Sequence, residues 1–293
     1  DLDRQAWINN GTGWLQDDAW VPPVCFVQKV TDLPNSDKGA RFFDANGDGL
    51  IEIVEARDEG TGCSTGIKNS SVNKAVNGYL LSNITTEFGG IISISYQKST
   101  SFNNSGGNDS FVDLVFNVFV VSNITYDNGV NNEQNLNYTN FYNYSNGMYN
   151  FRKKEFRGFG YVEEIIDNKV IRHWFHQDEA RKGREYETRI LDKNENQYKT
   201  TQKQWNSTLQ NNYNIVELIE ESELTYDGTS NNPKSKNTTY DYDGFGNIIF
   251  IHHKGDIADT NDDKYEYFNY LNNSNLWIVN KIKNYSLFDS IGS

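Results

Sequence analysis

An acidic segment rich in glycine carries the clearest candidate chemistry in this chain. It reads DANGDGLIE, and its oxygen donors fall at alternate positions: the side chains of Asp44, Asn46, Asp48 and Glu52 and the main-chain carbonyl of Leu50. Calcium takes about six to eight oxygen ligands, and a loop with this spacing can supply them. Carboxylates crowded into one short loop repel one another without a cation. The spacing therefore predicts a structural Ca²⁺ site.

Two alternatives to this site stay open. The twelve residues from Asp44 to Glu55 also fit the loop of an EF-hand, which requires a helix on each side. The exit is rich in β-branched residues (Ile51, Ile53 and Val54), which favours a loop between two strands. The other alternative is an acidic glycine turn that binds no metal.

The composition points to a protein with a sizeable aromatic core and a very polar surface. The 293 residues include 18 Tyr, 17 Phe and 6 Trp, enough for a sizeable core, and only one Met. The formal net charge of −13 disfavours nucleic acid as a partner and suits divalent cations. No apolar run approaches the roughly 18 residues that span a bilayer, so we expect no transmembrane segment. The chain opens without a signal peptide, and we expect a fragment of a longer protein or a mature form.

Cysteines and glycosylation sequons predict an extracellular or cell-surface location. Cys25 and Cys63 either form one disulfide or remain two buried thiols. The pattern Asn-x-Ser/Thr marks candidate glycosylation sites at Asn10, Asn69, Asn83, Asn103, Asn123, Asn137, Asn143, Asn206, Asn237, Asn272 and Asn284.

Short apolar runs separated by turn residues predict an all-β fold. Asn-Gly in AWINNGTGW and Gly-Gly at 89–90 each predict a hairpin, and further hairpins are expected along the chain to its end. Residues 59–76 are interpreted as a polar loop and residues 131–150 as two edge strands. The period of residues 214–228 does not distinguish a strand from a helix, but the flanking Tyr and Thr favour a strand. Changes in composition predict domain boundaries near residues 75 and 200.

Residues that could catalyse a reaction form no convincing constellation. His173 and His176 lie on opposite faces of any strand that contains both, so they cannot share a metal. His176 with Asp178 is more simply a solvated hydrogen bond than a catalytic base. The glycines of GFG at 158–160 and 244–246 open no helix and indicate bulges or close backbone approach, not a phosphate loop. We therefore predict that the chain is not an enzyme.

The motifs also resemble known families. INNGTGW, WVPP and KGARFFDANGDGLIEIVEAR resemble a calcium-binding FG-GAP (VCBS-type) propeller blade, in which Asp44, Asn46, Asp48 and Glu52 match the ligand positions. NGYLLSNITTEFGGIISISYQKS, FRKKEFRGFGYVEEI and HQDEARKGREYETRILDKNENQYKTTQKQW resemble the middle region of Tc-toxin B components. TTYDYDGFGNIIFIHHKGD resembles an RHS/YD repeat.

This resemblance implies an architecture and a function. We expect a partial propeller-type blade over residues 1–75, a Tc-toxin-B-middle-like β region over 76–200 and an RHS/YD-like hairpin region over 201–293, the last two forming an extended, twisted antiparallel β-sheet shell. The implied function is a calcium-stabilised structural or carrier scaffold, whose partners are other protein subunits or the remainder of a longer chain. The alternative is a cell-surface adhesin or glycan-binding module, or a subunit of a surface filament. Trp7, Trp14 and Trp20 are then a candidate sugar-binding face.

Overall fold

The computed structural model describes most of the chain: residues 5–28, 36–47, 49–57, 67–71, 80–106, 113–130, 136–229 and 231–289. The chain divides into two compact units. The first holds residues 1–81 with 116–119, and the second holds 82–115 with 120–293. Within the described residues there is no α-helix, which confirms the all-β prediction. No described helix is long and apolar enough to cross a membrane.

The first unit contains three small antiparallel sheets, with strand orders β1-β2, β3-β4 and β5-β6-β7. Its elements are β1 (Trp7–Asn9), β2 (Trp14–Gln16), the 3₁₀ turn η1 (Asp18–Trp20), β3 (Val27–Gln28), β4 (Ser36–Asp37), β5 (Ala40–Phe43), β6 (Glu52–Arg57) and β7 (Ile67–Ser71). The hairpin β1-β2 confirms the prediction for AWINNGTGW. β7 corrects the prediction of an uninterrupted loop over residues 59–76, because its polar side chains gave no strand signal although its backbone pairs with β6.

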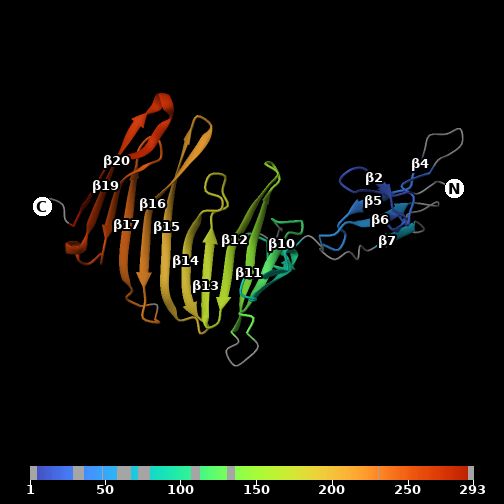
Figure 1. Cartoon of the computed structure of the whole chain (residues 1–293), viewed down its shortest axis with the longest axis horizontal. Helices are drawn as coiled ribbons and strands as arrows, with labels where there is room; N and C mark the ends of the chain where they lie inside the picture. Colours follow the sequence, from blue (N-terminus) through green and yellow to red (C-terminus); the bar gives the residue numbers. More distant parts are fainter. Residues whose placement is uncertain are drawn as a thin grey trace. The chain divides into compact units, whose positions relative to one another are not determined.

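The second unit contains one open antiparallel sheet of thirteen strands in its described part, ordered β8 to β20 as in the sequence. Figure 1 shows β10 to β20 following one another along this sheet. Its elements are β8 (Asn83–Thr85), β9 (Ile91–Lys98), η2 (Ser99–Ser101), β10 (Phe119–Asp127), β11 (Asn137–Asn150), β12 (Glu155–Ile166), β13 (Lys169–Phe175), β14 (Glu185–Asp192), β15 (Gln197–Gln210), β16 (Tyr213–Thr225), β17 (Lys234–Tyr242), β18 (Ile248–Lys254), η3 (Thr260–Asp262), β19 (Lys264–Asn273), η4 (Ser274–Leu276) and β20 (Ile278–Phe288).

Two hairpin turns of this sheet are stabilised by the same pattern of hydrogen bonds between an Asp side chain and the backbone of the turn. Asp192, at the end of β14, accepts hydrogen bonds from the backbone N–H groups of Asn194 and Asn196. Asp243, after β17, accepts them from Phe245 and Asn247. Short acidic side chains that bond the backbone a few residues ahead stabilise tight turns. The Asp and Asn content therefore reflects turn formation between long strands.

The predicted pair of edge strands over residues 131–150 is wrong where the structure describes it. Residues 137–150 form the single strand β11, which lies between β10 and β12. Asn146-Gly147, a dipeptide typical of hairpin turns, forms a bulge here, with a φ of 56° at Asn146 and a register shift after Gly147. A Cβ at Gly147 would lie 2.7 Å from Asn104 Oδ1 and 2.8 Å from Leu114 Cδ2, so glycine permits that packing.

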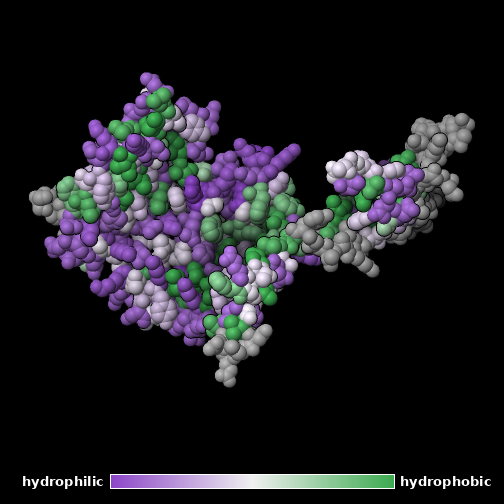
Figure 2. Space-filling view, viewed as in Figure 1, coloured by the Kyte–Doolittle hydropathy of each residue, from purple (hydrophilic) through white to green (hydrophobic). Residues whose placement is uncertain are grey.

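Few side chains of the large sheet are fully buried. The strand register places five buried residues on one face of the sheet: Val170, Leu191, Thr200, Asn237 and Tyr265. Most other positions are half-buried, because within the described part of the second unit no second layer of strands covers either face. Figure 2 shows mixed polar and apolar side chains over the visible surface, with apolar ones gathered at the tip of the β19-β20 hairpin.

Candidate functional site

The predicted calcium loop lies between two paired strands of the first unit. β5 and β6 are antiparallel, and Phe43 faces Glu52 at the point where the loop begins and ends. Gly47 and Gly49 have positive φ angles of 72° and 81°, which glycine adopts without steric cost. The EF-hand alternative is excluded because strands, not helices, flank the loop.

Glu52 is the most deeply buried of the predicted ligands that the structure describes. It is 1% exposed, and its Oε2 accepts a hydrogen bond from the backbone N–H of Ala45 at 2.8 Å. Its Oε1 is buried and has no hydrogen-bond partner. A buried polar atom without a partner costs about 1–3 kcal/mol, and more for a charged group. A cation bound to this oxygen would remove that cost.

The other predicted ligands are described only in part. Asp44 Oδ2 accepts the backbone N–H of Gly49 at 2.7 Å, which closes the loop, and Asn46 and Leu50 lie within it. Asp48 lies outside the described residues. Among the side chains that the structure describes, no three His, Cys, Asp or Glu residues form a group suited to a metal ion. The calcium site therefore stays a prediction, with Glu52 as its best-supported member.

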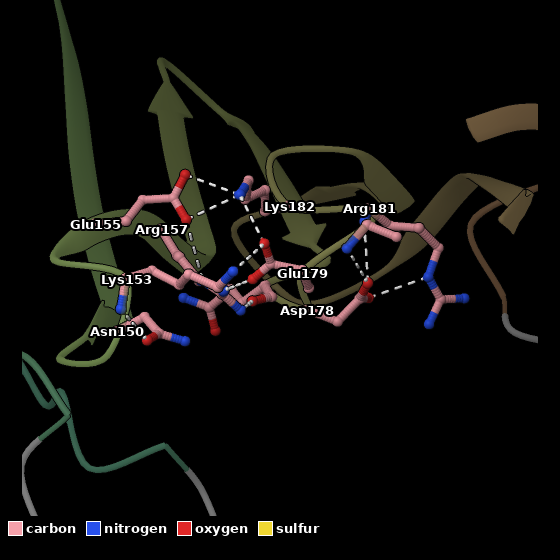
Figure 3. Close-up of polar contacts among 10 residues, drawn as sticks. Asn150, Lys153, Glu155, Arg157, Asp178, Glu179, Arg181 and Lys182 are labelled. Atoms are coloured by element: carbon pink, nitrogen blue, oxygen red, sulfur yellow. Dashed lines mark hydrogen bonds and ion pairs between the residues drawn. The ribbon is translucent and has the colours of Figure 1, made fainter. Parts of the chain in front are cut away.

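A polar network in the second unit joins β12 to the loop after β13 (Figure 3). At its centre is Arg157, whose side chain is 5% exposed. Its Nη1 donates to the carbonyl of Gln177 at 3.0 Å, its Nη2 pairs with Glu179, and its Nε lies 3.5 Å from Glu155. Lys182, which lies in the same loop after β13, donates a hydrogen bond to Glu155 at 2.8 Å. The network holds a charged side chain in a buried position by giving it several partners.

The side chain of Gln177 extends this contact to the neighbouring strands. Its Nε2 donates to the carbonyls of Asn146 and Gly158, at 2.7 Å and 3.0 Å. A Cβ at Gly160 would lie 2.8 Å from Gln177 Oε1, so the first GFG motif permits a close approach, as predicted. Arg157 and Gln177 were not predicted as partners from the sequence, although the glycines of GFG marked the place of contact.

Each of the four histidines lies beside a carboxylate. His173 Nδ1 is 2.6 Å from Glu185, His252 Nε2 is 2.8 Å from Asp263, and His253 Nε2 is 2.6 Å from Glu266. His176 Nδ1 lies 3.8 Å from Asp178, beyond hydrogen-bond distance. The first three pairs join β13 to β14 and β18 to the residues at the start of β19, which explains them as structural contacts, whereas His176 and Asp178 lie in the same loop.

Glu185 is the most perturbed carboxyl of these pairs. The hydrogen bond to His173 lowers the pKa of Glu185 to about 2, and Lys203 adds a second favourable contact at 2.9 Å. His173 lies in β13, Glu185 in β14 and Lys203 in β15. The ionised carboxylate therefore helps to hold three consecutive strands together.

The remaining predicted sites stay predictions. Cys25 is half-buried and Cys63 lies outside the described residues, so the disulfide is not tested. Several sequons lie on exposed backbone, whereas Asn237 is 6% exposed and donates to Glu220 and Ser222. That burial makes Asn237 a poor glycan acceptor in the folded chain.

A family model described as insecticide toxin TcdB middle/N-terminal region matches residues 27–178, about half of the chain. Comparison with the curated proteins finds none that matches.

Solved Tc-toxin structures share the fold. The Tc holotoxin pore of Photorhabdus luminescens matches 82% of this chain with a TM-score of 0.60 at 12% identity. TcdB2-TccC3 matches 85% with a TM-score of 0.60 at 13% identity, and TcdB2-TccC3 without its hypervariable C-terminal region matches 97% with a TM-score of 0.62 at 12% identity. The matched parts are 16%, 17% and 18% of those chains, so this chain spans about a sixth of their length.

Proposed function

Because the chain belongs to the family of the insecticide toxin TcdB middle/N-terminal region, we propose that it is a non-catalytic wall segment of a toxin-type β-sheet shell. The observation that carries this proposal is the open antiparallel sheet, whose described strands follow one another in chain order over β8 to β20. Such a ribbon of strands provides a broad surface from a single layer. A catalytic site, in contrast, needs a concave cluster of reactive groups.

The polar character of the sheet supports a wall that faces water on both sides. The face that carries buried Val170 and Leu191 also carries Arg172, which pairs with Glu163 at 2.9 Å and with Glu195 at 2.6 Å. A sheet packed against a second apolar layer would carry a continuous apolar face instead. We propose that other protein subunits, or further parts of a longer chain, complete the shell in an extracellular setting.

The experiment that tests the wall function is cross-linking mass spectrometry on the polypeptide purified from its natural source. We expect lysine cross-links from Lys281 and Lys283, on the last strand of the sheet, to another polypeptide or to residues outside the sequence printed here. Lys153 and Lys182, inside the polar network, serve as internal controls that cross-link within the chain. A monomer whose β20 lysines link only to β19 would contradict the proposal.

The finer proposal is that Ca²⁺ stabilises an FG-GAP-like blade over residues 1–75. The buried, unpaired Oε1 of Glu52 and the strands that flank the loop support it. We expect a calcium chelator to lower the melting temperature, and Asp48→Ala to abolish that sensitivity. Asp259→Ala, in the second unit, is the matched control and should keep it. A melting curve that is unchanged by the chelator would refute a structural ion.

The RHS/YD-like character proposed for residues 201–293 rests on the sequence and on one turn. The DGFGN segment at 243–247 closes the β17-β18 hairpin through Asp243, and Asn247 Nδ2 also donates to the carbonyl of Val279 in β20. This turn therefore contacts the next hairpin as well as closing its own.

Glycan binding is a second candidate, favoured by exposed tryptophans. Trp7 and Trp14 are 52% and 66% exposed, and the hairpin register places both on one face of β1-β2. Aromatic faces can stack on sugar rings. Binding on a glycan array that is lost in Trp7→Ala and Trp14→Ala would support this function, and an array without binding would exclude it for the glycans displayed.

A further inference from the structure

The first unit includes a segment that returns to it from far along the sequence. Residues 116–119 belong to this unit, about 65 residues beyond the acidic loop. Within this segment Asn117 interrupts an apolar run, VFNVFVV. A polar residue at such a position requires a partner for its carboxamide.

Asn117 lies directly against the acidic loop. A Cβ at Gly49 would overlap Nδ2 of Asn117 and would lie 2.9 Å from Cε2 of Phe119. Gly49 is therefore constrained twice, by its φ of 81° and by the carboxamide packed on its α-carbon. This contact places the Asn117 amide at the wall of the loop that Asp44 and Glu52 close.

Both polar atoms of the Asn117 side chain are buried, and neither has a hydrogen-bond partner. Glu52 Oε1 is in the same state, on a residue that is 1% exposed. Buried polar atoms in native proteins nearly always have partners. A half-turn of the carboxamide exchanges its oxygen and nitrogen, so its oxygen can face the loop. One hard cation between these groups would satisfy a carboxylate oxygen and an amide oxygen together.

We propose that Asn117 is a calcium ligand supplied from outside the acidic loop, through its side-chain oxygen. The inference rests on the proposed calcium site and deepens it: the ion would join the loop of residues 44–52 to the segment 116–119. Amide oxygens are ordinary calcium ligands, and a neutral one completes the coordination without adding repulsion among the carboxylates.

The test uses the full chain and compares four proteins: the unaltered chain, Asn117→Leu, Asn117→Asp and the control Asn272→Leu, at an exposed site on β19. Calcium affinity is measured by titration calorimetry on protein freed of metal. Loss of one ligand in Asn117→Leu should weaken binding on the order of tenfold, and Asn117→Asp should restore it because an oxygen is kept. Asn272→Leu should bind as the unaltered chain does.

A second measurement separates ligation from packing. Terbium takes the place of calcium, and its luminescence lifetimes in H₂O and D₂O report the water molecules bound to the ion. Asn117→Leu should add about one water to the ion, since a lost protein oxygen is replaced by solvent. A chain that binds no calcium at all overturns both this inference and the proposed ion. Normal binding with an unchanged affinity and water count in Asn117→Leu overturns the role of Asn117 alone.

Discussion

At the scale of single residues, the second unit depends on charged side chains that are buried together with their partners. Arg157 is 8% exposed, yet it bonds to Gln177 and pairs with Glu179. Taking a guanidinium out of water is costly, so such a group persists only where several acceptors surround it. The guanidinium of arginine presents five N–H donors in a fixed planar fork, whereas lysine presents three donors from a single nitrogen.

Arg157→Ala should therefore destabilise the chain strongly. We expect a loss of about 3 kcal/mol in the free energy of unfolding, as for other broken buried pairs. Arg157→Lys should recover less than half of it. The control Arg152→Ala, at an exposed site three residues before Glu155 on the approach to β12, should change stability little. Urea unfolding measures all three, and equal stabilities of Arg157→Ala and Arg152→Ala would contradict this account.

Glu185 makes stability depend on pH in the acid range. Its pKa of about 2 in the folded chain lies below its ordinary value of 4.5, so folding favours the ionised form. Its contribution is complete above pH 4.5 and is lost as the pH falls toward 2. Glu185→Gln should cost about 1–2 kcal/mol at pH 7, after allowance for partial solvent screening.

The same substitution should also flatten the acid limb of the stability curve, because the lost proton-linked contribution no longer titrates. Glu87→Gln, on the exposed turn between β8 and β9, is the control and should leave that limb unchanged. Thermal melts between pH 2 and pH 7 record the difference. An acid limb in Glu185→Gln that is identical to that of the unaltered chain would show that another group dominates.

At the scale of elements, two loops of the second unit meet at a pair of glycines. Gly89 lies in the β8-β9 turn and Gly129 follows β10, and both have positive φ, 83° and 75°. A Cβ at Gly129 would overlap the carbonyl oxygen of Gly89, whereas one at Gly89 would meet nothing within 4 Å. Both positions therefore require a positive φ, but only at Gly129 would an added Cβ clash with the backbone of the other loop.

This difference gives a matched pair of substitutions. Gly89→Ala should cost only the strain of a positive φ, about 1 kcal/mol. Gly129→Ala should cost about 2–3 kcal/mol more, because backbone must move to admit the methyl group. Denaturant unfolding compares them directly. Equal costs would mean that the two loops separate easily, and that the contact contributes nothing to the fold.

The elements were largely predictable from the sequence, and the errors have identifiable causes. Alternating apolar residues and turns rich in Gly, Asn and Asp predicted the β8-β9 hairpin around residues 89–90 and the β17-β18 hairpin around residues 243–247. Residues 131–150, which are dominated by Tyr and Asn, were predicted as two edge strands, whereas the contact of Gly147 with Asn104 accommodates a bulge within the single strand β11. The strand pattern does not specify how many strands share one sheet, since that depends on long-range register.

The candidate site was predictable to a similar extent. The spacing of Asp44 and Glu52 placed a loop between strands, and the structure has those strands. The approach of Asn117 to Gly49 was not visible in the sequence, because the two residues are about 65 positions apart, and the spacing of the acidic loop alone did not show that Glu52 is buried. A lone Asn inside an apolar run was the available signal for Asn117.

At the scale of the whole molecule, the described sheet of the second unit ends in an exposed apolar strand. Along β20 the side chains of Ile278, Ile282 and Leu287 are 42%, 52% and 53% exposed. An open strand edge with apolar side chains is a site of pairing with other chains. In the proposed shell this edge would be covered, whereas the isolated chain leaves it open.

We therefore expect the isolated chain to self-associate as its concentration rises. Ile282→Lys should reduce this association, because a charged side chain on an edge strand opposes pairing. Leu209→Lys, at the equally accessible end of β15 and 69% exposed in the native residue, should have a smaller effect. Sedimentation velocity over a range of concentrations measures both. Association that Leu209→Lys removes and Ile282→Lys leaves would place the contact elsewhere.

The agreement between strand order and chain order has a consequence for how this protein comes into being. Every strand from β9 onward pairs with the one made just before it, and from β11 onward the two strands are joined by a short loop, whereas residues 99–118 separate β9 from β10. Low sequence separation between partners favours rapid folding. The sheet can therefore grow one ribbon at a time while the ribosome is still adding residues, and each completed hairpin offers a ready template for the next.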